Sequence, residues 1–210
     1  MTELFDFYQA DNAKAVFVFA HGAGAGKDHA FMQELSALLL AKQISVVRFN
    51  FPYMCKREED GKRRPPDRFP ALLAHYQQVL TELKTSLPVF IGGKSMGSRV
   101  AATLLAEPQV IDIKGGICIG YPFHPQKKPE NLRLTPLQAT QRPVLICQGD
   151  RDALGNKDEI SSYQLADFCQ VVYLPDGDHD LKPRVKSGFS HQQHKITTAK
   201  VIQEFIFAHC

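Results

Sequence analysis

The sequence predicts an α/β protein built on a doubly wound, mostly parallel sheet. Short, nearly continuous apolar segments alternate with longer segments in which apolar residues recur three and four positions apart. The first pattern is typical of strands covered on both faces, and the second is typical of helices that pack on such a sheet. Glycine-rich and acidic segments follow several of the apolar runs, where parallel sheets carry their functional groups.

The composition limits the class of protein before individual motifs are considered. The chain has 210 residues, of which 44% are hydrophobic and 22% charged, and no linker-like segment divides it. We therefore expect one domain over residues 1–210. No apolar run approaches the roughly 20 residues of a membrane helix, and the first residues, which include acids, are unlike a secretory signal. A cytoplasmic protein without a membrane partner is expected.

Charge and cysteine usage argue against further classes. The net charge of +3 is too small to predict a nucleic-acid partner. The five cysteines form no C-x-x-C pair, and three of them lie in or beside apolar runs, where a thiol behaves as a small hydrophobe. We expect neither a metal site nor a disulfide framework.

Six apolar runs are predicted as core strands of a sheet of six or seven strands. They are Ala15–Ala20, Ile44–Phe49, Val89–Gly92, Gly115–Gly120, Val144–Gln148 and Val171–Leu174. Leu4–Tyr8 is the candidate for an additional edge strand. Helical periodicity predicts helices over Asp28–Ala41, Asp67–Thr85, Ser95–Ala106, Asp158–Phe168 and His194–Phe207. The chain is thus a β-α alternation, without internal repeats.

The segment after the third core strand contains a G-x-S-x-G sequence, Gly93-Lys94-Ser95-Met96-Gly97. In this motif the serine lies on a tight turn between a strand and a helix, and a Cβ at either glycine would collide with one of them. Because a pentapeptide of this kind also occurs by chance, the prediction of a nucleophile at Ser95 depends on the rest of the chain.

A serine nucleophile needs a base to take its proton and an acid to orient that base. The chain supplies candidates directly after predicted strands, in the order Ser95, Asp150 or Asp152, and His179. Because the carboxyl ends of parallel strands meet at one edge of a sheet, these side chains are expected to converge. Asp152 is the preferred acid because it lies deeper in its loop, whereas Asp150 is better placed to hold the turn through its backbone.

Five other histidines are interpreted as surface or structural residues rather than as the base. His209 ends the last predicted helix, and His191 and His194 form the approach to that helix. His124 is also expected to be structural. His21 is expected to fix the glycine-rich loop that follows the first core strand.

That loop has a sequence that fails as a phosphate site. A P-loop requires G-x-x-x-x-G-K-[ST], but the segment begins at His21 and ends at Asp28. The third glycine of a dinucleotide fingerprint would fall on Lys27. We therefore expect no nucleotide cofactor in this loop.

An oxyanion hole, in contrast, needs only backbone N–H groups close to the nucleophile. One comes from the residue after the serine and another from the loop after the first core strand. Met96 and Ala23 are the predicted donors. Gly24 is the alternative to Ala23 if the loop runs one residue further.

Taken together, these motifs resemble those of small α/β-hydrolases without a cap, of the dienelactone-hydrolase-like type. The similarity runs through His21-Gly-Ala-Gly, Gly93-Lys-Ser-Met-Gly, Gly149-Asp-Arg-Asp and Gly177-Asp-His. The resemblance covers nearly the whole chain. It implies an α/β-hydrolase fold without a large cap domain, and a Ser-Asp-His hydrolase that needs no cofactor.

Within that superfamily the chain is most similar to a group of predicted hydrolases. This group includes the hydrolase-like domain of a subunit of the chromatin-associated non-specific-lethal complex. The closer likeness lies in Asn50-Phe-Pro-Tyr-Met54, Gly61-Lys-Arg-Arg-Pro-Pro-Asp67, Gly120-Tyr-Pro-Phe-His-Pro125 and Asp178-His-Asp-Leu-Lys-Pro183. Some members of the group serve as scaffolds, which the resemblance implies as an alternative to catalysis.

The predicted function is that of a serine hydrolase acting on a small-molecule carboxylic ester or thioester. Ser95 is the nucleophile, His179 the base and Asp152 the orienting acid. The proline-rich segment Tyr121–Arg142 is too short to form a sizeable lid, so we expect an open site.

Basic residues lie in two loops that are expected to border this site. They are Lys56, Arg57, Lys62, Arg63 and Arg64 in one loop, and Lys182, Arg184 and Lys186 in the other. They predict either a rim that binds an anionic substrate or partner, or simply a solvated charged segment. Lys94, Arg63, Arg64 and Tyr121 are the candidate substrate-binding residues. A catalytically silent scaffold that binds an anionic partner through this rim is the alternative function.

Overall fold

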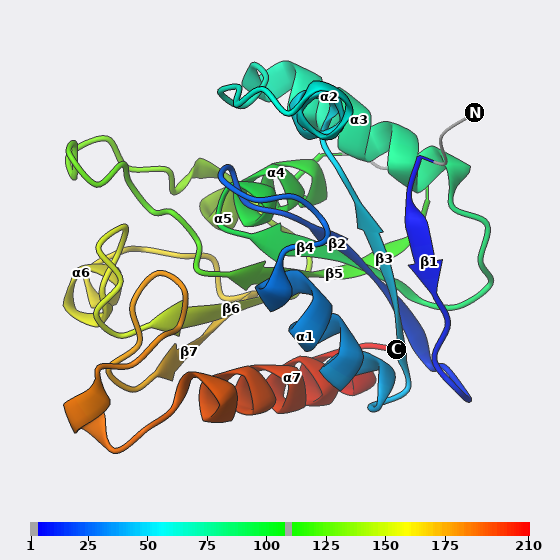
Figure 1. Cartoon of the computed structure of the whole chain (residues 1–210). Coiled ribbons are helices and arrows are strands. Elements are labelled where there is room, and N and C mark those ends of the chain that lie inside the picture. Colours follow the sequence, from blue (N-terminus) through cyan, green and yellow to red (C-terminus); the bar gives the residue numbers. More distant parts are fainter. Residues whose placement is uncertain (1–3, 108–110) are drawn as a thin grey trace.

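The computed structural model describes residues 4–107 and 111–210. Within these residues the chain forms a seven-stranded sheet with the order β1-β3-β2-β4-β5-β6-β7 (Figure 1). The strands are β1 (Asp6–Tyr8), β2 (Ala15–Ala20), β3 (Ile44–Phe49), β4 (Val89–Lys94), β5 (Ile113–Ile119), β6 (Val144–Gly149) and β7 (Cys169–Leu174). β1 pairs antiparallel with β3, and the other neighbours are parallel. The predicted sheet and its edge strand are confirmed.

Helices cover both faces of this sheet. They are α1 (Ala30–Leu40), α2 (Pro52–Asp60), α3 (Phe69–Glu82), α4 (Met96–Leu105), α5 (Thr135–Ala139), α6 (Lys157–Ser161) and α7 (His191–Ala208), with a 3-10 turn η1 at Val185–Ser187. α1 and α7 lie together on one face, and α3 and α4 lie on the other (Figure 1). No helix in the described part of the chain combines the length and the hydrophobicity needed to cross a bilayer.

Three helical segments differ from the prediction. α2 and α5 were not expected, and α6 ends at Ser161 rather than continuing to Phe168. α2 is mostly charged and buries only Tyr53 and Met54, so its sequence carries little helical periodicity. It begins with a proline and ends at Gly61, whose φ of +72° terminates the helix. Local capping residues and two buried contacts, rather than an apolar stripe, therefore define α2.

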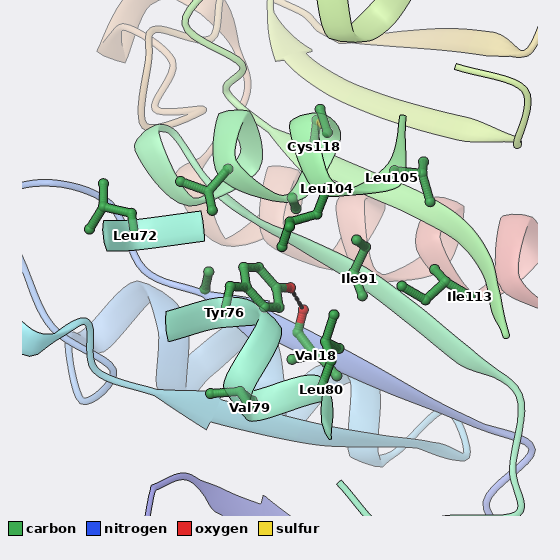
Figure 2. Close-up of a cluster of buried hydrophobic side chains, with 14 of the residues drawn as sticks. Val18, Leu72, Tyr76, Val79, Leu80, Ile91, Leu104, Leu105, Ile113 and Cys118 are labelled. Carbon is green, nitrogen blue, oxygen red and sulfur yellow. Dashed lines mark hydrogen bonds between the residues drawn. The ribbon is translucent and has the colours of Figure 1, made fainter. Parts of the chain in front are cut away.

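One apolar cluster packs between the sheet and α3 and α4 (Figure 2). At its centre lies Tyr76, whose side chain is fully buried. The Tyr76 hydroxyl donates a hydrogen bond to the Val18 carbonyl at 2.6 Å and accepts one from the Gly92 amide at 3.0 Å. Since Val18 lies on β2 and Gly92 on β4, this contact ties α3 to the two central strands.

The strand order places a crevice between the ends of β2 and β4. β3 follows β2 in the chain but lies on one side of it, while β4 lies on the other side. The connections therefore leave the sheet in opposite directions, and loops at such a point form a ligand-binding crevice. β4 leaves no room for a side chain between its two neighbours, because a Cβ at Gly92 would lie 2.0 Å from the Ile117 carbonyl oxygen of β5 and 2.7 Å from the Phe17 ring of β2.

Candidate active site

Ser95 lies on a sharp turn between β4 and α4. β4 extends through Lys94, two residues further than predicted, and α4 begins at Met96, so a single residue connects them. The backbone of Ser95 has φ +53° and ψ −115°, a conformation that is strained for a residue with a side chain. A Cβ at Gly93 would lie 2.4 Å from the backbone of Gly97. The glycines therefore permit the close turn that exposes Ser95.

The structure brings Ser95, His179 and Asp152 into one chain of hydrogen bonds. His179 Nε2 lies 2.7 Å from Ser95 Oγ, and His179 Nδ1 lies 2.8 Å from Asp152 Oδ2. Because Asp152 is an acceptor, Nδ1 carries the proton, and Nε2 is left to accept from the Ser95 hydroxyl. Asp152 is fully buried, whereas the His179 side chain is 27% exposed.

Both carboxylate oxygens of Asp152 are held by further donors. Gln148 Nε2 donates to Oδ2 at 2.8 Å, and the Leu154 amide donates to Oδ1 at 2.8 Å. Sequence reasoning missed Gln148, although a buried amide at the end of an otherwise apolar strand was a signal for a polar partner nearby. Asp150 instead holds the turn through its backbone, since its carbonyl accepts from the Lys157 amide at 3.1 Å.

Glycines at the strand ends make room for the loop that carries His179. Gly120, directly after β5, has φ +58°, and a Cβ there would lie 2.7 Å from the His179 carbonyl oxygen. At Gly149, the last residue of β6, a Cβ would lie 2.3 Å from the Asp178 carbonyl oxygen. The loop after β7 can therefore cross the ends of β5 and β6 and reach Ser95.

His21 fixes the glycine-rich loop after β2. Its Nδ1 donates to the Gly22 carbonyl at 2.7 Å, and its Nε2 accepts from the Phe51 amide at 3.0 Å. Burial lowers the pKa of His21 to about 4, so the ring is neutral at physiological pH. The Tyr53 hydroxyl donates to the Ala23 carbonyl at 3.0 Å. The loop is thus attached to the segment that follows β3.

This loop packs directly against the turn that carries Ser95. A Cβ at Gly22 would lie 3.6 Å from Ser95 Cβ. Among the residues described, the amides of Ala23 and Met96 donate to no protein acceptor, and the Gly24 amide is equally unoccupied. The predicted donors are therefore available, and Ala23 and Gly24 remain alternatives.

A cavity of about 300 Å³ adjoins Ser95. Its lining consists of Gly22, Ala23, Gly24, Ala25, His29, Phe31, Met32, Lys94, Ser95, His179 and Asp180. Phe31 and Met32, from the start of α1, form an apolar wall. No three potential metal-ligating side chains converge anywhere in residues 4–107 and 111–210.

Only one of the four candidate substrate-binding residues lines this cavity. That residue is Lys94, whose Nζ lies 3.0 Å from Asp180 Oδ1. Tyr121 is fully buried, and its hydroxyl donates to the Arg133 carbonyl at 2.8 Å. Arg63 and Arg64 lie in the connection between α2 and α3, where Arg63 is exposed and Arg64 pairs with Asp60. Tyr121, Arg63 and Arg64 are therefore not part of the cavity lining.

The sequence also matches a known family over most of its length. The profile of an alpha/beta hydrolase domain matches residues 13–207. The chain belongs to this alpha/beta hydrolase family. The matched residues include the whole of the site described above.

Solved structures share the fold of this alpha/beta hydrolase. A dienelactone hydrolase from Anabaena variabilis has a TM-score of 0.71 at 19% identity, over 98% of this chain and 91% of that chain. Est1E from Butyrivibrio proteoclasticus has a TM-score of 0.69 at 13% identity, over 97% and 94% respectively. An alpha/beta serine hydrolase without lid from Xanthomonas campestris has a TM-score of 0.67 at 17% identity, over 97% and 88%.

Similarity at this level of identity concerns the fold. The predicted fold, a dienelactone-hydrolase-like α/β-hydrolase without a large cap, is confirmed. The narrower resemblance to a subunit of a chromatin-associated complex stays a prediction.

Proposed function

We propose that this alpha/beta hydrolase is a serine hydrolase that cleaves a carboxylic ester or thioester. The observation that carries the proposal is the pair of hydrogen bonds at 2.7 and 2.8 Å that joins Ser95 through His179 to Asp152. The strained backbone of Ser95 adds support, because such strain is concentrated at functional sites.

In the proposed reaction, Ser95 Oγ attacks the carbonyl carbon of the substrate while His179 Nε2 takes the hydroxyl proton. Asp152 stabilises the resulting imidazolium through Nδ1–H. The amides of Met96 and of Ala23 or Gly24 stabilise the oxyanion. The intermediate then expels an alcohol or thiol, which leaves with the proton from His179. A water molecule, activated by His179 in the same way, releases the acid and restores Ser95.

The cavity favours a small and uncharged acyl group. Its volume of about 300 Å³ lies at the lower end of the range for ligand pockets. Phe31 and Met32 supply apolar contacts, and the charge of Lys94 is already balanced by Asp180. We therefore propose neutral short-chain esters or thioesters, rather than the anionic substrate that the basic residues had suggested.

The alternative scaffold function has less support from the charged loops. Arg64 pairs with Asp60, and Arg184 pairs with Asp176. These pairs reduce the positive charge that the rim can offer to an anionic partner. No specific contact in the described residues favours a scaffold over an enzyme.

The test is turnover of p-nitrophenyl acetate and butyrate together with labelling by a fluorophosphonate probe. Ser95→Ala should lower kcat by about 10³-fold or more and abolish labelling, by analogy with the removal of catalytic serines. Ser161→Ala is the control, because Ser161 is an exposed serine on α6. The proposal would be refuted if the probe did not label the wild type, or if it labelled Ser95→Ala equally.

A further inference from the structure

Three consecutive carbonyl groups of the loop that carries His179 accept hydrogen bonds from side chains of other elements. The pairs are the His179 carbonyl with Lys94 Nζ at 2.8 Å, the Asp180 carbonyl with His191 Nε2 at 2.9 Å, and the Leu181 carbonyl with His194 Nδ1 at 2.8 Å. A loop of this kind, placed after the last strand, gains its position from such contacts rather than from a strand or helix of its own.

The three donors come from two separate elements. Lys94 ends β4 and directly precedes Ser95, whereas His191 and His194 lie in the first turn of α7. Because carbonyl oxygens are acceptors, the proton of His191 must be on Nε2 and that of His194 on Nδ1. The loop is therefore attached both to the nucleophile turn and to α7.

Two features support a role of these contacts in holding the loop, beside the hydrogen bonds that Asp178 makes within it. Leu181 has a φ of +61°, a strained value for a residue with a large side chain, which persists only when its surroundings enforce it. Lys94 and His194 are 8% and 2% exposed. Burial of such polar side chains is unfavourable unless they are hydrogen-bonded, and the loop carbonyls supply partners for Lys94 Nζ and His194 Nδ1.

We propose that Lys94, His191 and His194 are positioning residues that hold His179 within hydrogen-bonding distance of Ser95. The proposal rests on the proposed roles of Ser95 and His179 as nucleophile and base. The backbone carbonyl of His179 accepts a hydrogen bond from Lys94, which ends β4. Because the ring belongs to the same residue, a shift of this carbonyl also shifts the ring. A misplacement of about 1 Å at a catalytic group can lower the rate as much as 10²-fold.

The test replaces each histidine with Asn or Gln. The side-chain amide of each replacement places a hydrogen-bond donor close to the position of one of the two ring nitrogens. The amide nitrogen of Asn lies near the position of Nδ1, and that of Gln lies near Nε2. His194→Asn and His191→Gln therefore keep the required donor, whereas His194→Gln and His191→Asn displace it. Each pair removes the same ring, so any general loss of packing appears in both of its members.

Compared with the donor-keeping member of the same pair, the displaced variants His194→Gln and His191→Asn should have kcat lowered about tenfold with KM changed less than about twofold. Neither histidine lines the cavity, and loss of the His191 ring that stacks on Phe31 is common to both His191 variants. The donor-keeping variants should stay within about threefold of the wild type. Hydrogen exchange at the amides of residues 179–182, measured on the same proteins, should be faster only in the displaced variants.

Equal kcat in both members of each pair, with Ser95-dependent turnover in the wild type, would overturn the positioning role and leave the proposed function intact. Absence of Ser95-dependent turnover in the wild type would overturn the proposed function and the catalytic consequence of the contacts together. Unchanged hydrogen exchange in the displaced variants would show independently that these histidines do not hold the loop.

Discussion

Asp152 differs from Asp150 in what its carboxylate contacts. Asp152 is fully buried and faces His179, with additional donors from Gln148 and Leu154. These contacts fix the orientation of the carboxylate toward Nδ1 of the ring. At the scale of single residues, Asp152 therefore faces the His179 ring, whereas Asp150 contacts its turn through the backbone carbonyl.

Asp152→Asn should test this difference. The amide can present a donor to His179 and favour the wrong tautomer, so we expect kcat to fall by about 10⁴-fold, as for the equivalent change in other triads. Asp150→Asn is the matched control and should change kcat by less than about threefold. An equal loss in both variants, measured with p-nitrophenyl butyrate, would contradict the assignment of the acid.

His21 predicts a pH dependence of folding. Its pKa falls from the ordinary value of 6.5 to about 4 because of burial, and protonation would remove the acceptor used by the Phe51 amide. A lowered pKa of a base means that the folded state favours the neutral ring. The stabilisation is complete above pH 6.5 and is lost as the pH falls from 6.5 to about 4, with a total of about 3 kcal/mol.

The measurement is urea unfolding of the wild type and of His21→Gln between pH 4 and pH 7.5. The difference between their free energies of unfolding should decrease toward low pH, since Gln does not titrate in this range. A difference that is independent of pH would show that His21 does not favour the neutral form in the folded protein.

At the scale of elements, the turn at Ser95 depends on how closely β4 and α4 approach β2. A Cβ at Gly97 would lie 2.5 Å from the Ala20 carbonyl oxygen, whereas a Cβ at Gly24 would have no neighbour within 4 Å. Gly97→Ala forces the helix away from the strand. Gly24→Ala adds a methyl group in open space.

We expect Gly97→Ala to lower the free energy of unfolding by at least about 1–3 kcal/mol, the usual cost of overpacking. Gly24→Ala should change it by less than about 0.5 kcal/mol, as at other open surface positions. Urea denaturation of both variants provides the comparison. Equal stability of the two would mean that α4 moves without cost and that the turn does not require glycine.

At the scale of the whole molecule, the sheet collects loops that are far apart in the chain. The loops after β2, β4, β6 and β7 meet at one edge and supply Ala23, Ser95, Asp152 and His179 respectively. α1 closes one side of the cavity with an apolar wall. The pocket therefore has polar groups near Ser95 and an apolar wall on one side. The positive charge of Lys94 is paired with Asp180 inside the pocket.

That pairing predicts selectivity between two esters of equal chain length. We expect the wild type to have a kcat/KM at least about tenfold higher for p-nitrophenyl butyrate than for the hemisuccinate, whose carboxylate would compete with Asp180 for Lys94. In Asp180→Asn, Lys94 loses its counter-charge, so the ratio should shift toward the hemisuccinate. A wild type that prefers the hemisuccinate would contradict the proposal of a neutral substrate.

Much of the fold could be predicted because its signals are local. Buried strands such as Ala15–Ala20 appear as apolar runs, and helices such as α3 and α4 carry a clear apolar period. α2 could not be predicted, since only Tyr53 and Met54 are buried in a mostly charged segment. Its helical state depends on its end-capping and on packing against the rest of the molecule.

The sequence alone was enough to predict the β-α order, the glycine-flanked Ser95 and the order of Ser95, Asp150 or Asp152, and His179 at strand ends. These features follow from side-chain periodicity and from the steric demands of glycine, which act within a few residues. The contacts between distant segments, in contrast, become visible only in the folded structure: Gln148 with Asp152, His191 and His194 with the His179 loop, and Asp180 with Lys94. Polar side chains pair with whichever groups lie within hydrogen-bonding distance. For residues from separate segments, these distances are set only when the sheet has assembled.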